Sequence, residues 1–364
     1  MRAAVLEEAG KPVVIRQDVE IAAPKAGQVS VEVRHCGLCH SDLSIIDGVF
    51  PGMMPLVLGH EAAGVVAEVG PGVTSLVPGD HVVLTPTPPC GTCYWCVRGE
   101  ASVCTNANSI VTGLLPDGTT PLSMNGEPVY RGVGVGAFAD RVVTPETGAV
   151  KIDKDIPLDV ACVIGCAVQT GTGAVLNAAG VQSGDTVLIM GLGGVGLSAV
   201  QGARVAGASR ILVSDPVSSR REAAMAMGAT DLLDPMKDDV AAAAQAINGV
   251  GVDYAFETAG KSALLDVGLA AIRNGGTLVS VGAPPLEETF TILPAAFVIT
   301  GKKLISTVLG DAHSLRDIPR YLDLWKSGRL DLEALITNSR PMEEINEACD
   351  DLRSGKGVRT VLNF

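Results

Sequence analysis

The strongest chemical signal in the sequence is a group of four closely spaced cysteines. Its members are Cys90, Cys93, Cys96 and Cys104. Two intervals of two residues bring three sulfurs around one point, and a fourth cysteine after a short loop completes a tetrahedral zinc site. Four thiolates leave no open coordination position, so we expect this zinc to be structural. Disulfides are the alternative, but the chain has nine cysteines, an odd number, and metal ligation suits a reducing compartment better.

A second signal is the glycine-rich run Gly191-Leu192-Gly193-Gly194-Val195-Gly196. It follows an expected strand and opens an expected helix, the setting in which such a run binds a dinucleotide. The first glycine makes the turn, the second lets the backbone approach the pyrophosphate, and the third lets the helix pack on the sheet. Asp215 ends the next strand, where a carboxylate accepts hydrogen bonds from the ribose hydroxyls of NAD and repels the 2′-phosphate of NADP. We therefore predict NAD, although Arg220 could contact the adenosine ribose or tolerate a phosphate.

The elements that position these residues fall into two classes along the chain. In the first part, Val29, Val31 and Val33 alternate with polar residues, and Gly64–Val69 and Asp80–Leu84 are further strand candidates. Short strands separated by Pro-Gly turns predict a partly open β-barrel.

From about residue 180 the sequence alternates between short apolar runs and helical stretches. This alternation predicts a doubly wound parallel sheet, which is an α/β fold. The expected strands are Thr186–Met190, Arg210–Ser214, Asp253–Phe256 and Thr277–Val281. The expected helices are Ser218–Met227, Asp238–Ile247 and Ser262–Ile272, followed near the end of the chain by Leu315–Trp325, Glu343–Leu352 and a strand, Arg359–Leu362.

Length, composition and charge exclude several classes of function. The 364 residues suggest two domains, and 27 basic against 40 acidic residues give a formal net charge of −13. Such a chain has no general attraction for nucleic acid or anionic lipid. The N-terminus lacks the apolar core of a signal peptide, and the longest apolar run, around Val187–Val200, is too short to span a bilayer. We expect a cytoplasmic protein.

Several short motifs, taken in order, resemble those of the zinc-containing medium-chain alcohol dehydrogenases. Besides the four cysteines and the glycine run, they are Gly37-Leu38-Cys39-His40-Ser41-Asp42, Gly59-His60-Glu61, Ile164-Gly165-Cys166 and, near the C-terminus, the stretch 353–360. The resemblance covers nearly the whole chain and points to the long-chain, dimeric type. It implies a GroES-like, partly open barrel as the catalytic domain, residues 1–167 and 309–364, and a Rossmann NAD-binding domain, residues 168–308.

The resemblance also implies a second zinc, bound by Cys39, His60 and Cys166 with one position left open for substrate. This is also the ligand set that metal chemistry suggests for a catalytic zinc, so we expect two zinc ions per chain. Asp42 would accept a hydrogen bond from His60 and fix its tautomer. Glu61 would lie behind the metal or serve as a buried structural carboxylate.

The reaction implied by the resemblance is oxidation of an alcohol to its aldehyde, through a zinc alkoxide and hydride transfer to NAD. Ser41 would carry the hydroxyl proton outward. Many relatives continue the relay with a histidine where this chain has Ser44, so the final base is undefined. Cys36 and Cys162 match no ligand position and are expected to be packing residues.

Other assignments rest on the resemblance alone. Cofactor contacts are expected from His40, Arg359, Thr170 and Val281; His40 and Arg359 would touch the pyrophosphate or else be solvated surface residues. The substrate pocket is expected to include Phe50, Pro86, Ala283 and Val308 in addition to Ser41 and Val281. These mostly small, apolar side chains favour a medium-sized, aromatic or terpenoid primary alcohol.

Two rival functions stay open. Glutathione-dependent formaldehyde dehydrogenases share the architecture, but they carry acidic residues just before the Gly-His-Glu motif, and Val49–Met54 contains none. An inactive binding protein would be expected to lose zinc ligands, whereas all seven candidates are present. The resemblance also implies a homodimer, because dimeric members of the family keep the longer form of the segment from Thr105 to Val135; the contact would run through edge strands near Lys302–Val308.

Overall fold

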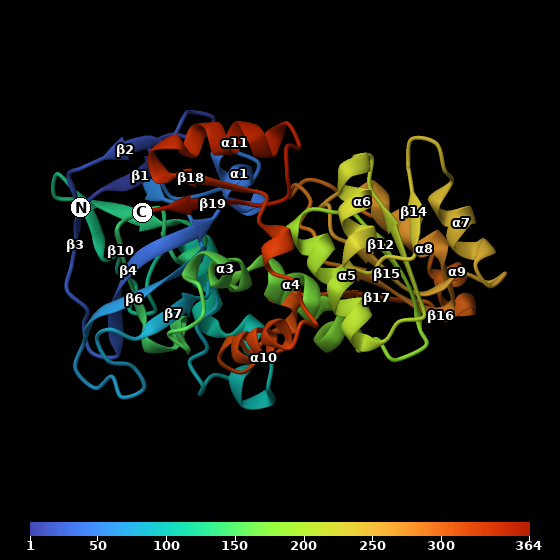
Figure 1. Cartoon of the computed structure of the whole chain (residues 1–364), viewed down its shortest axis with the longest axis horizontal. Helices are drawn as coiled ribbons and strands as arrows, with labels where there is room; N and C mark the ends of the chain where they lie inside the picture. Colours follow the sequence, from blue (N-terminus) through green and yellow to red (C-terminus); the bar gives the residue numbers. More distant parts are fainter. The chain divides into compact units, whose positions relative to one another are not determined.

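The computed structural model describes all 364 residues and divides them into two compact units (Figure 1). The first unit comprises Met1–Cys166, His313–Asp323 and Ile336–Phe364, and the second comprises Ala167–Ala312 and Leu324–Leu335. These limits differ from the sequence-based domain boundaries mainly in Leu324–Leu335, which we expected in the catalytic domain. Two hydrogen bonds are among the contacts that hold this segment to the rest of the second unit. Asp331 N donates to the side chain of Gln201 (2.6 Å), whose Nε2 donates to Asp331 O (2.9 Å).

The first unit is built from two curved sheets. One has the strand order β11-β7-β6-β4-β19-β18, with β10 also paired to β4, and the other has the order β2-β1-β5-β9-β8-β3. The strands are β1 (Ala3–Leu6), β2 (Val14–Arg16), β3 (Val19–Ile21), β4 (Gln28–Gly37), β5 (Leu56–Val57), β6 (Glu61–Val69), β7 (His81–Leu84), β8 (Leu122–Met124), β9 (Glu127–Arg131), β10 (Arg141–Pro145), β11 (Ala149–Ile152), β18 (Asn338–Pro341) and β19 (Thr360–Asn363). Its helices are α1 (His40–Ile46), α2 (Ser109–Thr112), α3 (Leu158–Ala161), α11 (Ile345–Arg353) and most of α10 (Ser314–Lys326).

Strand β4 is the central element of this unit. It pairs antiparallel with β6, β10 and β19, and Val29, Val31 and Val33 are buried in the core, as the alternation predicts. The pairing with β19 brings the C-terminal strand beside Cys36 and Gly37. The C-terminal strand therefore lies next to the end of β4, a few residues before α1 begins.

The second unit is a six-stranded parallel sheet with the order β14-β13-β12-β15-β16-β17. The doubly wound parallel sheet expected from the sequence is confirmed. Its strands are β12 (Thr186–Met190), β13 (Arg210–Ser214), β14 (Asp231–Leu233), β15 (Val252–Glu257), β16 (Ile272–Ser280) and β17 (Lys303–Ser306). Its helices are α4 (Ala167–Gly173), α5 (Gly194–Ala206), α6 (Ser218–Met227), α7 (Val240–Ala246), α8 (Ser262–Ala271) and α9 (Pro294–Thr300), with a π-helical turn at Ala174–Ala179.

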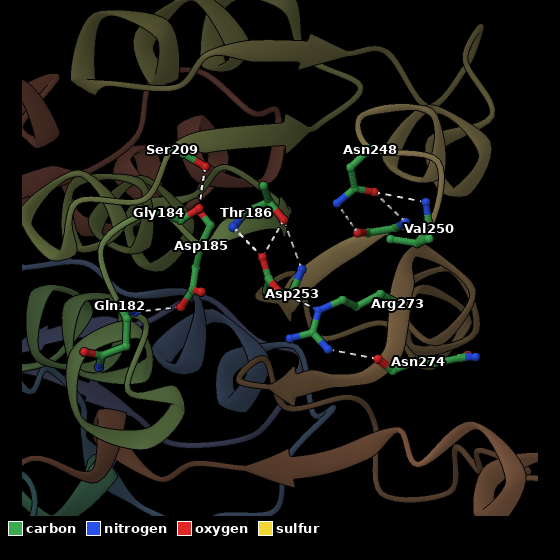
Figure 2. Close-up of polar contacts among 11 residues, drawn as sticks. Gln182, Gly184, Asp185, Thr186, Ser209, Asn248, Val250, Asp253, Arg273 and Asn274 are labelled. Carbon is green, nitrogen blue, oxygen red and sulfur yellow. Dashed lines mark hydrogen bonds and ion pairs between the residues drawn. The ribbon is translucent and has the colours of Figure 1, made fainter.

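The amino ends of the central strands β12 and β15 are joined by polar side chains (Figure 2). One carboxylate oxygen of Asp253 accepts hydrogen bonds from Thr186 N and Oγ1 (2.8 Å each), and the other accepts one from Arg273 Nε (2.7 Å). These contacts satisfy the polar groups at the end of the sheet opposite the glycine-rich run.

No single helix combines the length and the apolar character that crossing a bilayer would require. Only the bent helix pair Leu158–Gly165 and Ala167–Ala179 reaches both limits together.

Candidate metal centres and dinucleotide site

The first candidate metal centre gathers residues that lie far apart in the sequence. One donor atom each from Cys39, His60, Glu61 and Cys166 lies within 4.8 Å of the others. Cys39 precedes α1, His60 and Glu61 stand at the start of β6, and Cys166 follows a 3₁₀ turn at Cys162–Gly165. His60 is fully buried, and its Nε2 has no hydrogen-bond partner. A buried, unpartnered imidazole nitrogen beside two sulfurs fits a zinc ligand set, because a protein otherwise satisfies such an atom.

Asp42 fixes the orientation of His60. Its carboxylate accepts hydrogen bonds from His60 Nδ1 (3.1 Å), Gly59 N (2.9 Å) and Cys39 N (3.1 Å). Because Nδ1 then carries the proton, Nε2 is the nitrogen available to a metal. Asp42 is itself fully buried at the third position of α1, where it also caps the helix.

The sulfurs of this centre are strongly coupled. A hydrogen bond from Cys166 lowers the pKa of Cys39 well below the ordinary value of a thiol, against the effect of burial and with help from Arg359 and His60. The same hydrogen bond, together with burial, raises the pKa of Cys166. The thiolate is the form that binds a metal, so Cys39 is ready to ligate, whereas Cys166 must lose its proton when a metal binds.

Glu61, whose carboxylate belongs to this cluster, is paired with Arg359. Arg359 Nε lies 3.2 Å from Glu61 Oε2, and its Nη1 donates to Leu38 O (2.6 Å). Both side chains are buried, and burial raises the pKa of Glu61 to about 8 although Arg359 opposes the shift. Gly37 makes room for the pair, since a Cβ there would lie 2.5 Å from Glu61 Oε2. Neither this ion pair nor the requirement for glycine at position 37 is evident from the sequence.

The second candidate metal centre is the four-cysteine group. All four sulfurs lie within 4.8 Å of one another and all four cysteines are free of disulfides. Cys93 Sγ and Cys104 Sγ are 3.8 Å apart, which matches the spacing of about 3.8 Å that tetrahedral Zn–S bonds of about 2.3 Å impose. The backbone N–H groups of Thr105 and Cys96 lower the pKa of Cys93 to about 5. These residues fit a closed, structural zinc site.

The glycine-rich run lies between β12 and α5 in the second unit. Gly191 has a φ of 94°, a left-handed conformation, and a Cβ there would lie 2.8 Å from Ala259 Cβ. At Gly196 a Cβ would lie 1.9 Å from Gly191 O, so helix α5 can pack this closely only without a side chain. A Cβ at Gly193 would meet no atom within 4 Å, and this is the position expected to face the pyrophosphate. The packing therefore explains why Gly191 and Gly196 lack a side chain, and the role of Gly193 toward the dinucleotide stays a prediction.

Asp215 follows the end of β13 and faces this turn. Its carboxylate accepts hydrogen bonds from Leu192 N (2.8 Å) and Val217 N (2.9 Å). On the adjoining helix α6, Arg221 donates to the backbone carbonyl of Asp215 and pairs with Asp234 (3.1 Å). Arg220 is half-buried with an unpartnered Nε, so it is the arginine of this pair that is free to meet a ligand.

Comparison with known proteins shows which family the chain belongs to. Residues 25–154 match the family model described as an alcohol dehydrogenase GroES-like domain, and residues 194–327 match the zinc-binding dehydrogenase model. The chain is 38% identical to an NDMA-dependent alcohol dehydrogenase of Amycolatopsis methanolica, over 99% of this chain and 98% of the relative. It is also 38% identical to an S-(hydroxymethyl)glutathione dehydrogenase of Escherichia coli, over 100% and 99% respectively. The chain belongs to the zinc-containing medium-chain alcohol dehydrogenase family.

The fold of this chain is similar to that of solved structures in this family. The crystal structure of benzyl alcohol dehydrogenase from Acinetobacter calcoaceticus matches with a TM-score of 0.94 and 33% identity, covering 100% of this chain and 99% of that one. The GroES-like and Rossmann architecture expected from the sequence is thereby confirmed. By the reaction it catalyses, the protein is an NAD-dependent zinc alcohol dehydrogenase.

The remaining expected site residues of this alcohol dehydrogenase are divided between the two units. In the first unit, Ser41 Oγ lies 3.8 Å from Cys39 Sγ and His40 is exposed at the start of α1. Phe50 is half-buried against the core, and Pro86 is buried. The others belong to the second unit: Thr170 on α4, Val281 directly after β16, Ala283, which is exposed, and Val308, which is 44% exposed.

The three hydrogen bonds to Asp42 lead to a prediction for this dehydrogenase. In an Asp42→Asn variant, the amide NH₂ would face at least one N–H donor that the carboxylate now satisfies, and the imidazole would lose its fixed tautomer. We expect kcat/KM to fall about 10–100-fold and zinc at this centre to dissociate more readily. Asp47→Asn, at the exposed C-terminal end of the same helix, is the control and should retain activity. Equal activity in both variants would show that Asp42 does not position His60.

Proposed function

We propose that the protein interconverts a medium-sized, aromatic or terpenoid primary alcohol and its aldehyde with NAD. The observation that carries the reaction is the set of buried Cys39, buried His60 and half-buried Cys166, with the unpartnered Nε2 of His60. The apolar character of Val49–Met54 and of the expected pocket residues supports the substrate class, and so does the likeness to a benzyl alcohol dehydrogenase.

In this proposal a zinc ion bound to those three residues supplies a Lewis acid that makes an alcohol hydroxyl more acidic. Asp42 holds the His60 ring in one tautomer, and the Glu61–Arg359 pair supports the centre from behind. Ser41, half-buried beside Cys39, accepts the proton of the alcohol and passes it outward. The glycine-rich turn and Asp215 hold the dinucleotide by its pyrophosphate and ribose.

The proposed role of Ser41 can be tested by removing its hydroxyl. We expect Ser41→Ala to lower kcat at least about 10²-fold, the range of a lost proton-transfer group, while the affinity for NADH stays unchanged. Ser41→Thr retains a hydroxyl and should recover most of the turnover. Turnover at the wild-type level in Ser41→Ala would exclude this residue from the proton path.

The preference for NAD rests on the charge of Asp215. We expect Asp215→Gly to raise the ratio of kcat/KM with NADP to that with NAD at least about 10-fold, because the carboxylate no longer repels the 2′-phosphate. Asp215 also accepts two backbone N–H groups, so Asp215→Asn, which keeps the side-chain volume, serves as the companion variant. An unchanged ratio in both variants would mean that Asp215 only stabilises the turn.

A second candidate is a glutathione-dependent formaldehyde dehydrogenase. It is favoured by the 38% identity with S-(hydroxymethyl)glutathione dehydrogenases and disfavoured by the lack of acidic residues in Val49–Met54. NADH formation measured with benzyl alcohol, geraniol, hexanol, octanol, ethanol and formaldehyde plus glutathione separates the two. We expect kcat/KM to be highest for a large free alcohol; activity confined to the formaldehyde–glutathione mixture would establish the second candidate.

We also propose a homodimer. Strand β17 is the edge of the parallel sheet, with β16 as its only neighbour, and exposed apolar side chains lie on it and nearby. Leu304 is 37% exposed, Val308 44% and Ile299, on α9, 84%. An unpaired edge with apolar neighbours suits a two-fold contact with a second copy. Light scattering should give twice the mass of the chain, and a tetrameric mass would contradict the proposal.

A further inference from the structure

Arg131, at the end of β9, is a buried cation without a counter-ion. Only 2% of it is exposed, and it is the largest of the fully buried side chains. Its Nη1 donates to Gly134 O (2.6 Å), but its Nε has no partner and no carboxylate forms an ion pair with it. The acid whose charge it feels, Asp117, is already paired with Lys25 (2.8 Å). Although burial lowers the pKa of Arg131 to about 10, the side chain remains a cation at neutral pH.

This situation is unusual because buried charges in proteins are normally paired or bind an ion. A carbonyl oxygen, such as that of Gly134, satisfies one N–H but brings no opposite charge. The guanidinium has five N–H donors in all, so it can hold another acceptor without giving up the bond to Gly134.

A small cavity lies beside Arg131. It has a volume of about 10 Å³, which is close to the least that holds one water molecule, so only a very small ligand fits without movement of the lining side chains. Its other lining residues include Ile45, Met53, Leu56, Ile110 and Val133, and Arg131 is the only charged residue among those that line it.

The backbone at this cavity is strained. Val133 has φ 50° and ψ 32°, in the left-handed region, which a β-branched residue rarely adopts. Such outliers persist where the surrounding structure holds them, and they cluster at ligand-binding positions. Val133 and Arg131 line the same cavity and belong to one tight turn, in which Gly134 accepts the hydrogen bond from Arg131.

We propose that this cavity is a binding site for a small monovalent anion of the size of chloride, held by the guanidinium of Arg131. A water molecule would fill the volume but leave the charge uncompensated. Sulfate, or the carboxylate group of an organic molecule, is too large for the space. The site depends on neither zinc nor NAD, so it stands whether or not the proposed substrate is right.

The proposal can be tested on the wild-type holoenzyme in two ways. Crystals grown in sodium bromide should show an anomalous peak next to Arg131. Thermal unfolding at constant ionic strength should shift upward by about 2–5 °C when sodium gluconate is replaced by sodium chloride, and the shift should saturate with chloride concentration. Gluconate is much larger than chloride and carries the same charge, so the comparison at constant ionic strength separates binding of a small anion from screening by salt.

Two variants identify the residue responsible. Arg131→Met removes the charge and should abolish the chloride-dependent shift, whereas Arg34→Met, at an exposed arginine paired with Glu32, should retain it. Should Arg131→Met fail to fold, the bromide and chloride experiments on the wild type still decide. The absence of both the bromide peak and the chloride-dependent shift, or a shift that persists in Arg131→Met, would overturn the proposal.

Discussion

A Cys39→Ser enzyme is expected to bind one zinc per chain instead of two and to lose at least about 10³-fold in kcat/KM. The substitution changes one atom, but a serine hydroxyl is a much poorer zinc ligand than a thiolate. The expected loss corresponds to several kcal/mol of stabilisation of the developing negative charge, which is the magnitude attributed to a metal Lewis acid. Zinc content measured by mass spectrometry and NADH formation with the best alcohol of the panel give the two readouts.

The matched control for this variant is Cys36→Ser. Cys36 is also fully buried and lies three residues earlier, but it is absent from the metal cluster, and its sulfur contacts the carbonyl oxygen of Gly37 (3.7 Å), which a serine hydroxyl can also bind. We expect two zinc ions and near-normal activity. NADH binding, measured by fluorescence, should be retained in both proteins, because the glycine-rich turn is unaffected. Full activity in Cys39→Ser would exclude Cys39 as a ligand of the catalytic ion.

The parts of the fold that could be predicted from sequence are those specified by local patterns. Strands β12 and β13 and helix α6 have the predicted bounds because each is an uninterrupted apolar run or a helical stretch that ends at a glycine. Helix α7 was expected to begin at Asp238 but begins at Val240, since Asp239 caps it by accepting a hydrogen bond from Ala242 N (3.0 Å). Such small differences are expected where a cap residue precedes the helix.

Other elements have no local signal. Helix α4 was not predicted because it contains Gly171 and Gly173, which disfavour a helix in isolation. The structure explains them: a Cβ at Gly171 would lie 2.1 Å from Val195 O, so close packing on α5 requires glycine there. The pairing of β19 with β4 joins residues more than 300 positions apart, and only the fold reveals it.

The candidate sites also differ in how far a local sequence pattern predicts them. The four cysteines lie within one short segment and their spacing alone predicts a zinc site. The open centre draws on three distant segments, so its ligands were assigned through resemblance, and the structure places those side chains within reach of one ion. The Glu61–Arg359 pair and the unpaired charge of Arg131 could not be predicted. Charged side chains are usually exposed, and no local pattern in the sequence indicates that these three are buried.

The second large effect is expected at the structural centre. A Cys104→Ala protein should lose the zinc of the four-cysteine group, since three thiolates with an open position bind it much more weakly. Besides contributing a sulfur, Cys104 accepts hydrogen bonds from Cys90 N (3.3 Å) and Asn106 N (3.4 Å). The segment 90–108 contains only short 3₁₀ turns, so a zinc ion bound by its four cysteines would contribute much of its stability. We expect Tm to fall by at least about 5 °C and trypsin to cleave rapidly after Arg98.

The control variant is Cys349→Ala. It separates the effect of losing the zinc ion from the effect of removing a buried side chain. Cys349 is also only 2% exposed, but it lies on α11, outside both metal clusters, so its removal should leave two zinc ions and an intact segment 90–108. Because the catalytic ligands belong to other segments, Cys104→Ala should still bind one zinc and retain measurable turnover at low temperature. Loss of activity in proportion to zinc, with an unchanged Tm, would mean that this centre acts in the reaction and not in the stability of the fold.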